Sequence, residues 1–171
     1  MKKITSAYAN KMLRSLEEDK AFWTNKENSS CTYVAATNEE PVIPEYDYEE
    51  VSNTIAEIDN KMAKIKHALN LSNATAKVQV LGTEMSIDTI LIKMAQLNRR
   101  KSFLDYLRKQ QPKTREESRS YGARNAVPEY RYINYDLDLI KADYEKVSKE
   151  IMEMQMALDM YNQTVQFEVE I

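Results

Sequence analysis

The chain has 171 residues, a net charge of −3 and a charged fraction of 30%, values typical of an ordinary soluble domain. It contains only two glycines and four prolines, so we expect long uninterrupted elements in a single domain, 1–171. No apolar run approaches the ~20 residues of a membrane span. The basic N-terminus lacks the apolar core of a signal peptide, and a single cysteine excludes an internal disulfide. We therefore expect a cytoplasmic protein with no membrane partner.

The N-terminal quarter of the chain predicts a helix followed by an irregular connection. Residues 3–26 carry a broad apolar stripe at helical spacing, which predicts the first helix. Residues 28–45 include strand-forming residues at 32–34 and the breakers Pro41 and Pro44. We expect an edge strand there, followed by an irregular segment that leads into the second helix.

Residues 46–80 and 135–169 show one pattern twice, at an offset of 89 positions. The apolar positions are spaced three and four residues apart and coincide in the two copies. They are Tyr48, Val51, Ile55, Ile58, Met62, Ile65 and Leu69 in the first copy, and Leu137, Ile140, Tyr144, Val147, Ile151, Met154 and Leu158 in the second. This spacing predicts two equivalent amphipathic helices within an internal helix–strand repeat.

Each repeat helix is expected to end in a turn and a short strand. Beyond the helices, polar and apolar residues alternate in 76–80 and 165–170, which predicts strands with one apolar face. We expect the two strands to lie in the same sheet. Asn73 and Asn162 precede them and are expected to form equivalent turns, because asparagine tolerates left-handed backbone angles.

Two aspartates are expected to cap the repeat helices. Asp47 and Glu50 have the spacing of a capping box, in which the aspartate accepts hydrogen bonds from free N–H groups of the first turn. Asp136 stands at the same place in the second copy, although Leu139 cannot complete the box. Both helices therefore have a defined start in the sequence.

Between the two copies, the sequence predicts a turn, a long helix, a loop and a strand. Gly82 is expected to take a positive φ in the turn 81–84. Ser86 is expected to cap a helix that ends near Gln110, before Pro112. Residues 111–127 are polar and without periodicity, which predicts a flexible loop, and residues 130–134 alternate as a strand. The predicted fold is mostly α within the α+β class, with four long helices in a bundle and a small β-sheet at one end.

Basic residues are concentrated between positions 93 and 124, where ten basic residues face three acidic ones. Such a segment can contact the phosphate backbone of nucleic acid. The candidate contacts are Arg99, Arg100, Lys101, Arg108, Lys109, Lys113, Arg115, Arg119 and Arg124. The alternative interpretation is a solvated helix end whose basic residues pair with the acidic helices of the same chain.

The helices suggest a role in protein interaction rather than catalysis. Their stripes meet the minimum for a coiled coil, so they can pair within one bundle, with a second copy or with another protein. Six methionines are expected to make the helical interior adaptable, namely Met62, Met94, Met152, Met154, Met156 and Met160. His67 is the only histidine, and no metal set, phosphate loop or nucleophile elbow is present in the sequence. We predict a non-enzymatic module with no catalytic residues, metal or cofactor, and nucleic-acid binding as the alternative.

Several motifs resemble a family of uncharacterised bacterial proteins, some of which are labelled septicolysin. The similar motifs cover nearly the whole chain and include Ile65-Lys66-His67-Ala68-Leu69-Asn70, Asn73-Ala74-Thr75, Ile87-Asp88 and Gln155-Met156-Ala157-Leu158-Asp159. The resemblance implies the same fold. The label implies a pore-forming toxin, whereas the sequence has no membrane-inserting stretch, so we expect no such activity.

Overall fold

A computed structural model describes residues 1–116 and 127–171 of the chain. Its four helices are α1 (Ser6–Ser30), α2 (Tyr48–Thr75), α3 (Ile87–Arg108) and α4 (Leu137–Thr164). Its strands are β1 (Lys2–Thr5), β2 (Lys77–Val80), β3 (Thr83–Ser86), β4 (Lys113–Arg115), β5 (Tyr130–Tyr132) and β6 (Gln166–Val169). The predicted class is confirmed: the protein is mostly helical, with small antiparallel strand pairs.

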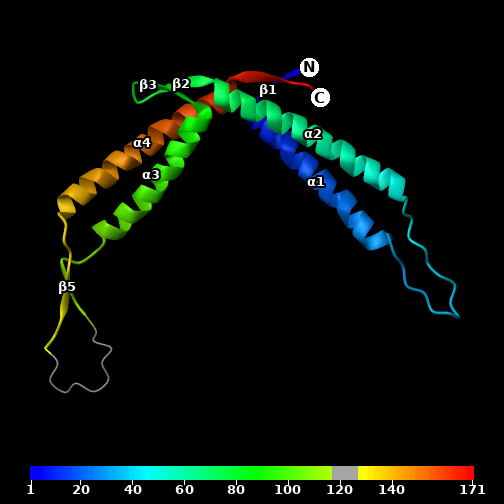
Figure 1. Cartoon of the computed structure of the whole chain (residues 1–171), viewed down its shortest axis with the longest axis horizontal. Helices are drawn as coiled ribbons and strands as arrows, with labels where there is room; N and C mark the ends of the chain where they lie inside the picture. The colour runs from blue at the N-terminus through cyan, green and yellow to red at the C-terminus, as the bar shows by residue number, and fades with distance from the viewer. Residues whose placement is uncertain (117–126) are drawn as a thin grey trace.

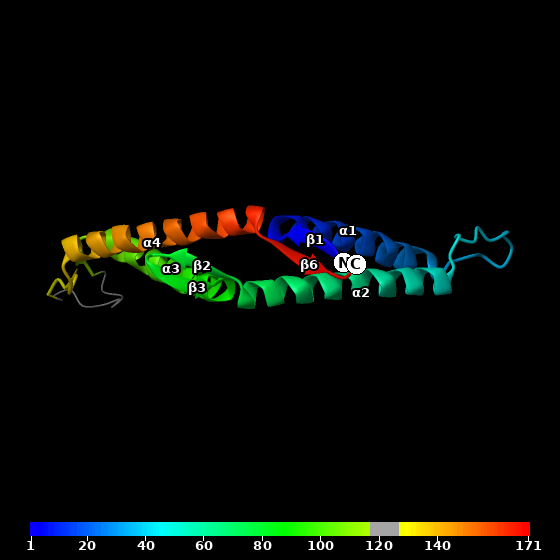
Figure 2. The same cartoon turned by 90° about the horizontal axis from the view of Figure 1, so that it is seen from above.

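The four helices pack as two antiparallel pairs that diverge from a common junction (Figure 1). We call α1, α2 and their connection the first arm, and α3, α4, β4 and β5 the second arm. From above, the molecule is long and narrow, with the junction strands between the arms (Figure 2). A narrow apolar stripe needs only one partner helix to cover it. Each arm therefore satisfies its own stripes, and the helices extend as two pairs instead of gathering into one bundle.

The strands form separate two-stranded sheets, with β1 paired to β6, β2 to β3 and β4 to β5. The prediction that 76–80 and 165–170 share a sheet is therefore wrong. Leu81 and Gly82 both have positive φ, 53° and 72°, which confirms the predicted turn. This two-residue turn lets β3 pair directly with β2. β6 pairs instead with β1 at residues 2–5, so the first helix starts at Ser6 and not at residue 3 as predicted.

The chain consists of two halves that share the order strand, helix, helix and strand, and the second half has the additional β4–β5 pair between its two helices. Ile4 of β1 lies opposite Phe167 of β6, and Met85 of β3 lies opposite Val78 of β2. Adding 81 to a residue number in β1 gives the equivalent residue of β3, and subtracting 89 from a residue number in β6 gives the equivalent residue of β2. With these shifts, all four residue pairs between β1 and β6 match the four pairs between β3 and β2. The two strand pairs therefore occupy equivalent places in the two halves. One is closed by the turn at Gly82, and the other is open where the N- and C-termini lie side by side (Figure 1).

Two buried clusters hold the junction, one at the base of each arm. The first contains Ile4, Ala9, Leu13, Ile65 and Val169. The second contains Val80, Met85, Ile87, Ile90, Met154, Leu158 and Tyr161. Ile65 and Met154 are separated by 89 positions and are 0% and 2% exposed. Residues of the repeated stripe thus fill equivalent places, and burial of their apolar surface stabilises each arm where it meets the strands.

Several local predictions are corrected by the structure. Asn73 and Asn162 lie in the last turns of α2 and α4, and each helix passes into an extended C-cap residue, so neither asparagine forms the expected turn. Residues 31–47, all of which are described, contain no strand, so the edge strand expected at 32–34 is absent. The backbone hydrogen bonds given for this connection are local, such as the one from the Glu39 N–H to the Ala36 carbonyl.

The predicted helix starts are largely confirmed. The carboxylate of Asp47 accepts hydrogen bonds from two N–H groups of the first turn of α2, and that of Asp136 does the same for α4. Ser86 precedes α3 as predicted, but its hydroxyl makes no capping bond to the backbone. The Ser86 hydroxyl instead bonds the carboxylate of Asp88, and this bond is the main cause that lowers the pKa of Asp88.

Candidate interaction surfaces

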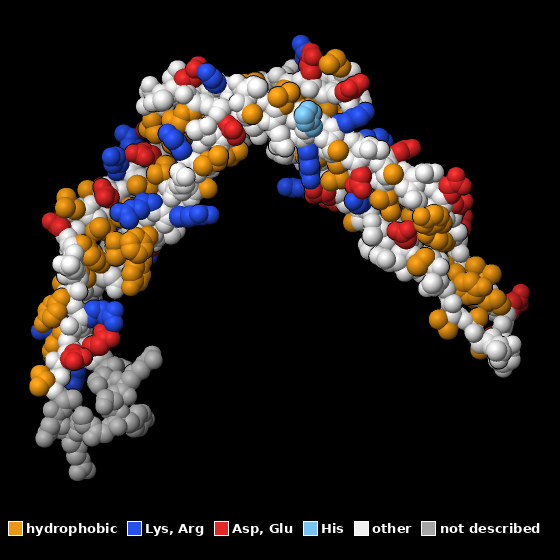
Figure 3. All heavy atoms as spheres, in the orientation of Figure 1, with side chains coloured by type: hydrophobic (Ala, Val, Ile, Leu, Met, Phe, Trp, Pro, Cys, Tyr) orange, Lys and Arg blue, Asp and Glu red, His pale blue; other side chains and the backbone are white. Residues whose placement is uncertain are grey.

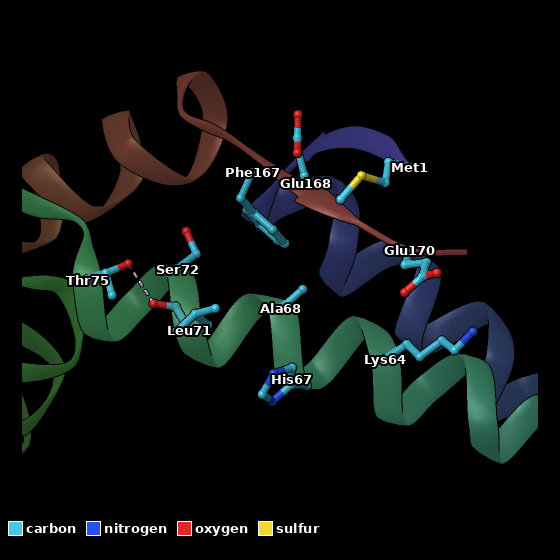
Figure 4. Close-up of a pocket in the computed structure, with 10 residues that line it drawn as sticks. All are labelled: Met1, Lys64, His67, Ala68, Leu71, Ser72, Thr75, Phe167, Glu168 and Glu170. Carbon is cyan, nitrogen blue, oxygen red and sulfur yellow. Dashed lines mark hydrogen bonds between the residues drawn. The ribbon is translucent and has the colours of Figure 1, made fainter.

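A groove of about 410 Å³ lies at the junction between α2 and β6. Its floor is apolar and includes Ala68, Leu71 and Phe167, while charged side chains such as Glu168 stand at its rim. Figure 4 shows the Phe167 ring directed from β6 toward α2. Lys64, His67, Glu168 and Glu170 also line the groove, so charged and polar side chains border its apolar part. The groove has the character of a shallow site for an apolar side chain.

A second groove, of about 260 Å³, occupies the equivalent position between α4 and β2. Its residues lie 89 positions from those of the first groove, as in the pairs Ala68 and Ala157, Leu71 and Met160, Thr75 and Thr164, and Phe167 and Val78. Ser72 and Tyr161, also 89 positions apart, share a hydrogen bond of 2.6 Å between their hydroxyl oxygens. Equivalent residues of the two halves therefore meet between the two grooves.

A stripe of exposed methionines runs along α4 from the second groove. Met152, Met156 and Met160 are 56%, 64% and 70% exposed, whereas Met154 is buried against the junction cluster. The expectation that the six methionines belong to the interior is correct for Met154, and Met62 and Met94 pack half-buried against the two clusters, but it is wrong for Met152, Met156 and Met160. Met152, Met156 and Met160 follow one another at i and i+4 spacing, so they share the outer face of α4. Flexible methionine surfaces can adapt to different partners.

The predicted nucleic-acid contacts lie on α3 and β4, where the structure describes them. Arg99, Arg100 and Lys101 are in the second half of α3, Arg108 and Lys109 are at its end, and Lys113 and Arg115 are in β4. Arg119 and Arg124 lie outside the described residues. The structure therefore brings seven of the nine residues onto one continuous region of the second arm.

Asp105 neutralises part of this basic region. Its carboxylate forms ion pairs with Arg108, at 2.7 Å, and with Lys109. The hydrogen bond from Lys109, followed by that from Arg108, lowers the pKa of Asp105. No described ion pair involves Arg99, Arg100, Lys101, Lys113 or Arg115. These five cations therefore remain available to a ligand within the described part of the arm.

Aromatic side chains are interleaved with these cations. The Lys113 ammonium lies 4.1 Å from the ring centroid of Tyr130, and the Arg108 guanidinium lies 4.0 Å from that of Tyr144. Arg100 approaches Phe103 at 5.8 Å. Such cation–π contacts hold basic groups beside aromatic rings. The rings of Phe103 and Tyr130 are exposed, and that of Tyr144 is half-buried. The charge pattern of the sequence reveals the cations but not these aromatic partners, which come from α3, α4 and β5.

The β4–β5 pair is fixed by a bidentate ion pair between Glu116 and Arg131, with two hydrogen bonds of 2.8 Å. The hydrogen bond from Arg131 lowers the pKa of Glu116. The hydroxyl of Tyr135 also donates to the carbonyl of Leu107 at 2.8 Å, which ties the chain after β5 to the end of α3. Residues 113–115 thus form a strand within the segment predicted as the loop 111–127, most of which lies outside the described residues.

The outer end of the first arm has the opposite charge. Residues 27–50 contain seven acidic residues and no basic residue. The acidic residues are Glu27, Glu39, Glu40, Glu45, Asp47, Glu49 and Glu50. Partial desolvation, and then the negative charge of Glu27, raises the pKa of Tyr46 in this region. Figure 3 shows acidic side chains along the outer part of the first arm, and both basic and acidic side chains along the second. A count of charges in sequence windows could have found this segment.

The described residues provide no further chemical constellation. Among residues 1–116 and 127–171, no group of three or more histidine, cysteine, aspartate or glutamate side chains could hold a metal ion. None of the helices in the described part is both long enough and apolar enough to cross a membrane. The surfaces with distinctive chemistry are therefore the junction grooves, the methionine stripe and the two charged arm ends.

No protein-family model matches the chain, and no curated protein does. A crystal structure of a functionally unknown conserved protein from Corynebacterium diphtheriae is similar to it, with a TM-score of 0.64. The match covers 98% of this chain and 100% of that chain, at 12% sequence identity. At this identity the likeness shows a shared fold. The resemblance to proteins labelled septicolysin stays a prediction.

Proposed function

We propose that the protein is a non-enzymatic structural or protein-interaction module that works in the cytoplasm. The observation that carries this proposal is its exposed surface. A compact monomer of 19.9 kDa would expose about 8,700 Å². This chain exposes 13118 Å². Two extended arms joined at a narrow junction enclose little space for a catalytic site. They do present binding surfaces that are well separated from each other.

The apolar part of this surface supports the proposal. Exposed Met152, Met156 and Met160 lie beside the second groove, and Leu71 lies in the first. Large exposed apolar patches mark sites where another molecule binds. A standard protein interface buries about 1,600 Å² in total, which is small compared with the exposed surface of this molecule. Each arm can therefore hold an interface while its own helix pair stays intact.

The test compares methionine oxidation by dilute hydrogen peroxide in purified protein and in native cell extract. Met152, Met156 and Met160 are expected to oxidise rapidly in the dilute purified protein. A bound partner in the extract would slow all three, because it would cover the outer face of α4. Buried Met85 and Met154 provide the internal control, since their rates depend on opening of the junction.

Equal oxidation rates of the three exposed methionines in both samples would contradict a partner on this face. A slower rate at Met85 and Met154 as well would indicate general stabilisation of the fold rather than a local contact. The readout is peptide mass spectrometry, which resolves each methionine separately.

Nucleic-acid binding is the second candidate function, favoured by the cations and exposed rings of the second arm. Arginine and lysine can neutralise phosphates, and exposed rings such as Phe103 and Tyr132 can stack on bases. Binding of a single-stranded oligonucleotide should fall steeply with salt and with the double substitution Arg99→Ala, Arg100→Ala. Absence of binding to either DNA or RNA at low salt would reject this candidate.

A further inference from the structure

Two described segments of this chain carry equal and opposite formal charge. We define the acidic end as residues 27–50, which carry seven acidic residues and no basic ones. We define the basic face as residues 93–115, which carry eight basic residues and a single acidic one, Asp105. Their formal charges are therefore −7 and +7.

These two surfaces cannot neutralise each other within one molecule. The acidic end lies at the far end of the first arm, and the basic face lies along the second arm, which diverges from the first (Figure 1). No described ion pair includes an acidic residue of 27–50. On the basic face, only Arg108 and Lys109 have described carboxylate partners, and both use Asp105. Most of both charges therefore faces solvent.

We propose that the acidic end of one molecule binds the basic face of a second copy of the same chain. This inference rests on the proposed interaction function and names its partner. Each molecule has one acidic end and one basic face. They lie on different arms, and the two arms extend from equivalent halves of the junction. Two copies related by a twofold axis can therefore satisfy both contacts at once. The assembly closes as a dimer, because a twofold interface uses the same surfaces on both copies.

The side chains at both surfaces suit a contact of this type. The acidic end also exposes Val34, Val42 and Ile43, and the basic face exposes Phe103 and Tyr106. Apolar and aromatic side chains surrounded by complementary charges are the usual composition of a protein interface. The charges guide encounter and orientation, and burial of the apolar groups contributes the remaining affinity. Arg99 and Arg100 are exposed and meet the carboxylates in this arrangement.

The proposal is tested with two charge-reversed full-length chains. One carries Glu39→Lys and Glu40→Lys, and the other carries Arg99→Glu and Arg100→Glu. Light scattering at low salt should show wild type at twice the monomer mass. Each variant alone should dissociate at least about tenfold more readily, because like charges then face each other. An equimolar mixture of the two variants should recover the dimer, because the reversed surfaces are again complementary.

Matched controls reverse the same number of charges away from the proposed contact. Asp159→Lys with Glu170→Lys changes acidic residues near the junction, and Lys11→Glu with Arg14→Glu changes basic residues on α1. All four positions are exposed and take part in no described ion pair. Both controls should dimerise as wild type does. Wild-type association should also weaken as salt rises above about 0.15 M, where the screening length is about 8 Å.

Three results would overturn the proposal. The first is a wild-type protein that is monomeric at low salt. The second is that each charge-reversed variant alone dimerises as well as wild type. The third is that the mixture of variants stays monomeric although both variants keep wild-type helicity by circular dichroism. Loss of oligonucleotide binding by the Arg99→Glu, Arg100→Glu variant without any self-association would assign the basic face to nucleic acid instead. Protection of the α4 methionines in extract, combined with a monomeric wild type, would leave the proposed function standing and reject only this inference.

Discussion

The two halves of the chain are alike at the junction and different at their outer ends. Both have a strand, two helices and a strand, and α2 and α4 each contain 28 residues. At the outer ends, the first arm has an irregular acidic connection at 31–47, whereas the second has the basic β4–β5 pair. Equivalent apolar positions fix the packing at the junction. The solvent-facing ends are free of that constraint, so differences in binding can arise there without altering the fold.

The strongest way to test the equivalence of the halves is to truncate the same buried position in each. Ile65→Ala and Met154→Ala remove side chains that are 0% and 2% exposed and lie 89 positions apart. Each should lower the free energy of unfolding by about 2–5 kcal/mol, through lost burial and the cavity left behind. Urea denaturation followed by circular dichroism measures both effects.

Hydrogen exchange sharpens this comparison because it reports which arm loosens. Ile65→Ala should increase exchange mainly in α1 and α2, and Met154→Ala mainly in α3 and α4. The two clusters would not be equivalent in stability if one substitution lowered the free energy of unfolding by less than about 1 kcal/mol and the other by about 2–5 kcal/mol.

Removal of the two helix caps should have a smaller effect. Asp47 and Asp136 each accept two hydrogen bonds from the first turn of their helix. Asp47→Ala and Asp136→Ala should each cost about 1 kcal/mol, within the usual range for an N-cap. The matched substitutions Asp47→Asn and Asp136→Asn keep an accepting oxygen and should cost less. Unequal losses would locate a difference between the arms at their helix starts, which thermal unfolding can detect.

The sequence contained more information on the junction than on the arrangement of the arms. Apolar spacing predicted α2 and α4, and Gly82 predicted its turn, because these signals are local. The pairing of β1 with β6 was missed, because it joins residues 2–5 to the chain's other end and a four-residue strand resembles the start of a helix. The divergence of the arms was also missed, because periodicity identifies a helix face but not which neighbour covers it.

The candidate surfaces were predictable to different degrees. The basic residues between 93 and 115 were visible in the sequence because they cluster along the chain. The grooves were not, because each combines a helix with a strand from a distant segment, such as Ala68 with Phe167. The exposure of Met156 was also not predictable, because a methionine at helical spacing suits either a core or a surface.

The hydrogen bond between equivalent residues tests how closely the halves are joined. Tyr161→Phe removes the hydroxyl that bonds the Ser72 hydroxyl at 2.6 Å, and the ring stays in the junction cluster. The loss should be about 1 kcal/mol, typical of one partly buried hydrogen bond. Ser72→Ala provides the reciprocal variant, and the double variant should cost little more than either single one. Additive losses in this double-mutant cycle would show that the two hydroxyls contribute independently.

The smallest expected effect is an acid response confined to the outer end of the second arm. Hydrogen bonds from Lys109 and Arg108 lower the pKa of Asp105, and a hydrogen bond from Arg131 lowers that of Glu116. Carboxyl groups with a lowered folded-state pKa stabilise the fold above their ordinary pKa of about 4. This stabilisation is lost as the pH falls through the lowered value. Amide exchange in β4 and β5 should therefore increase on acidification below about pH 4, relative to its intrinsic rate. In the Glu116→Gln variant, β4 and β5 should already exchange faster at neutral pH, and acidification should change their exchange little further. If the variant instead responds to acid as wild type does, other groups cause the effect.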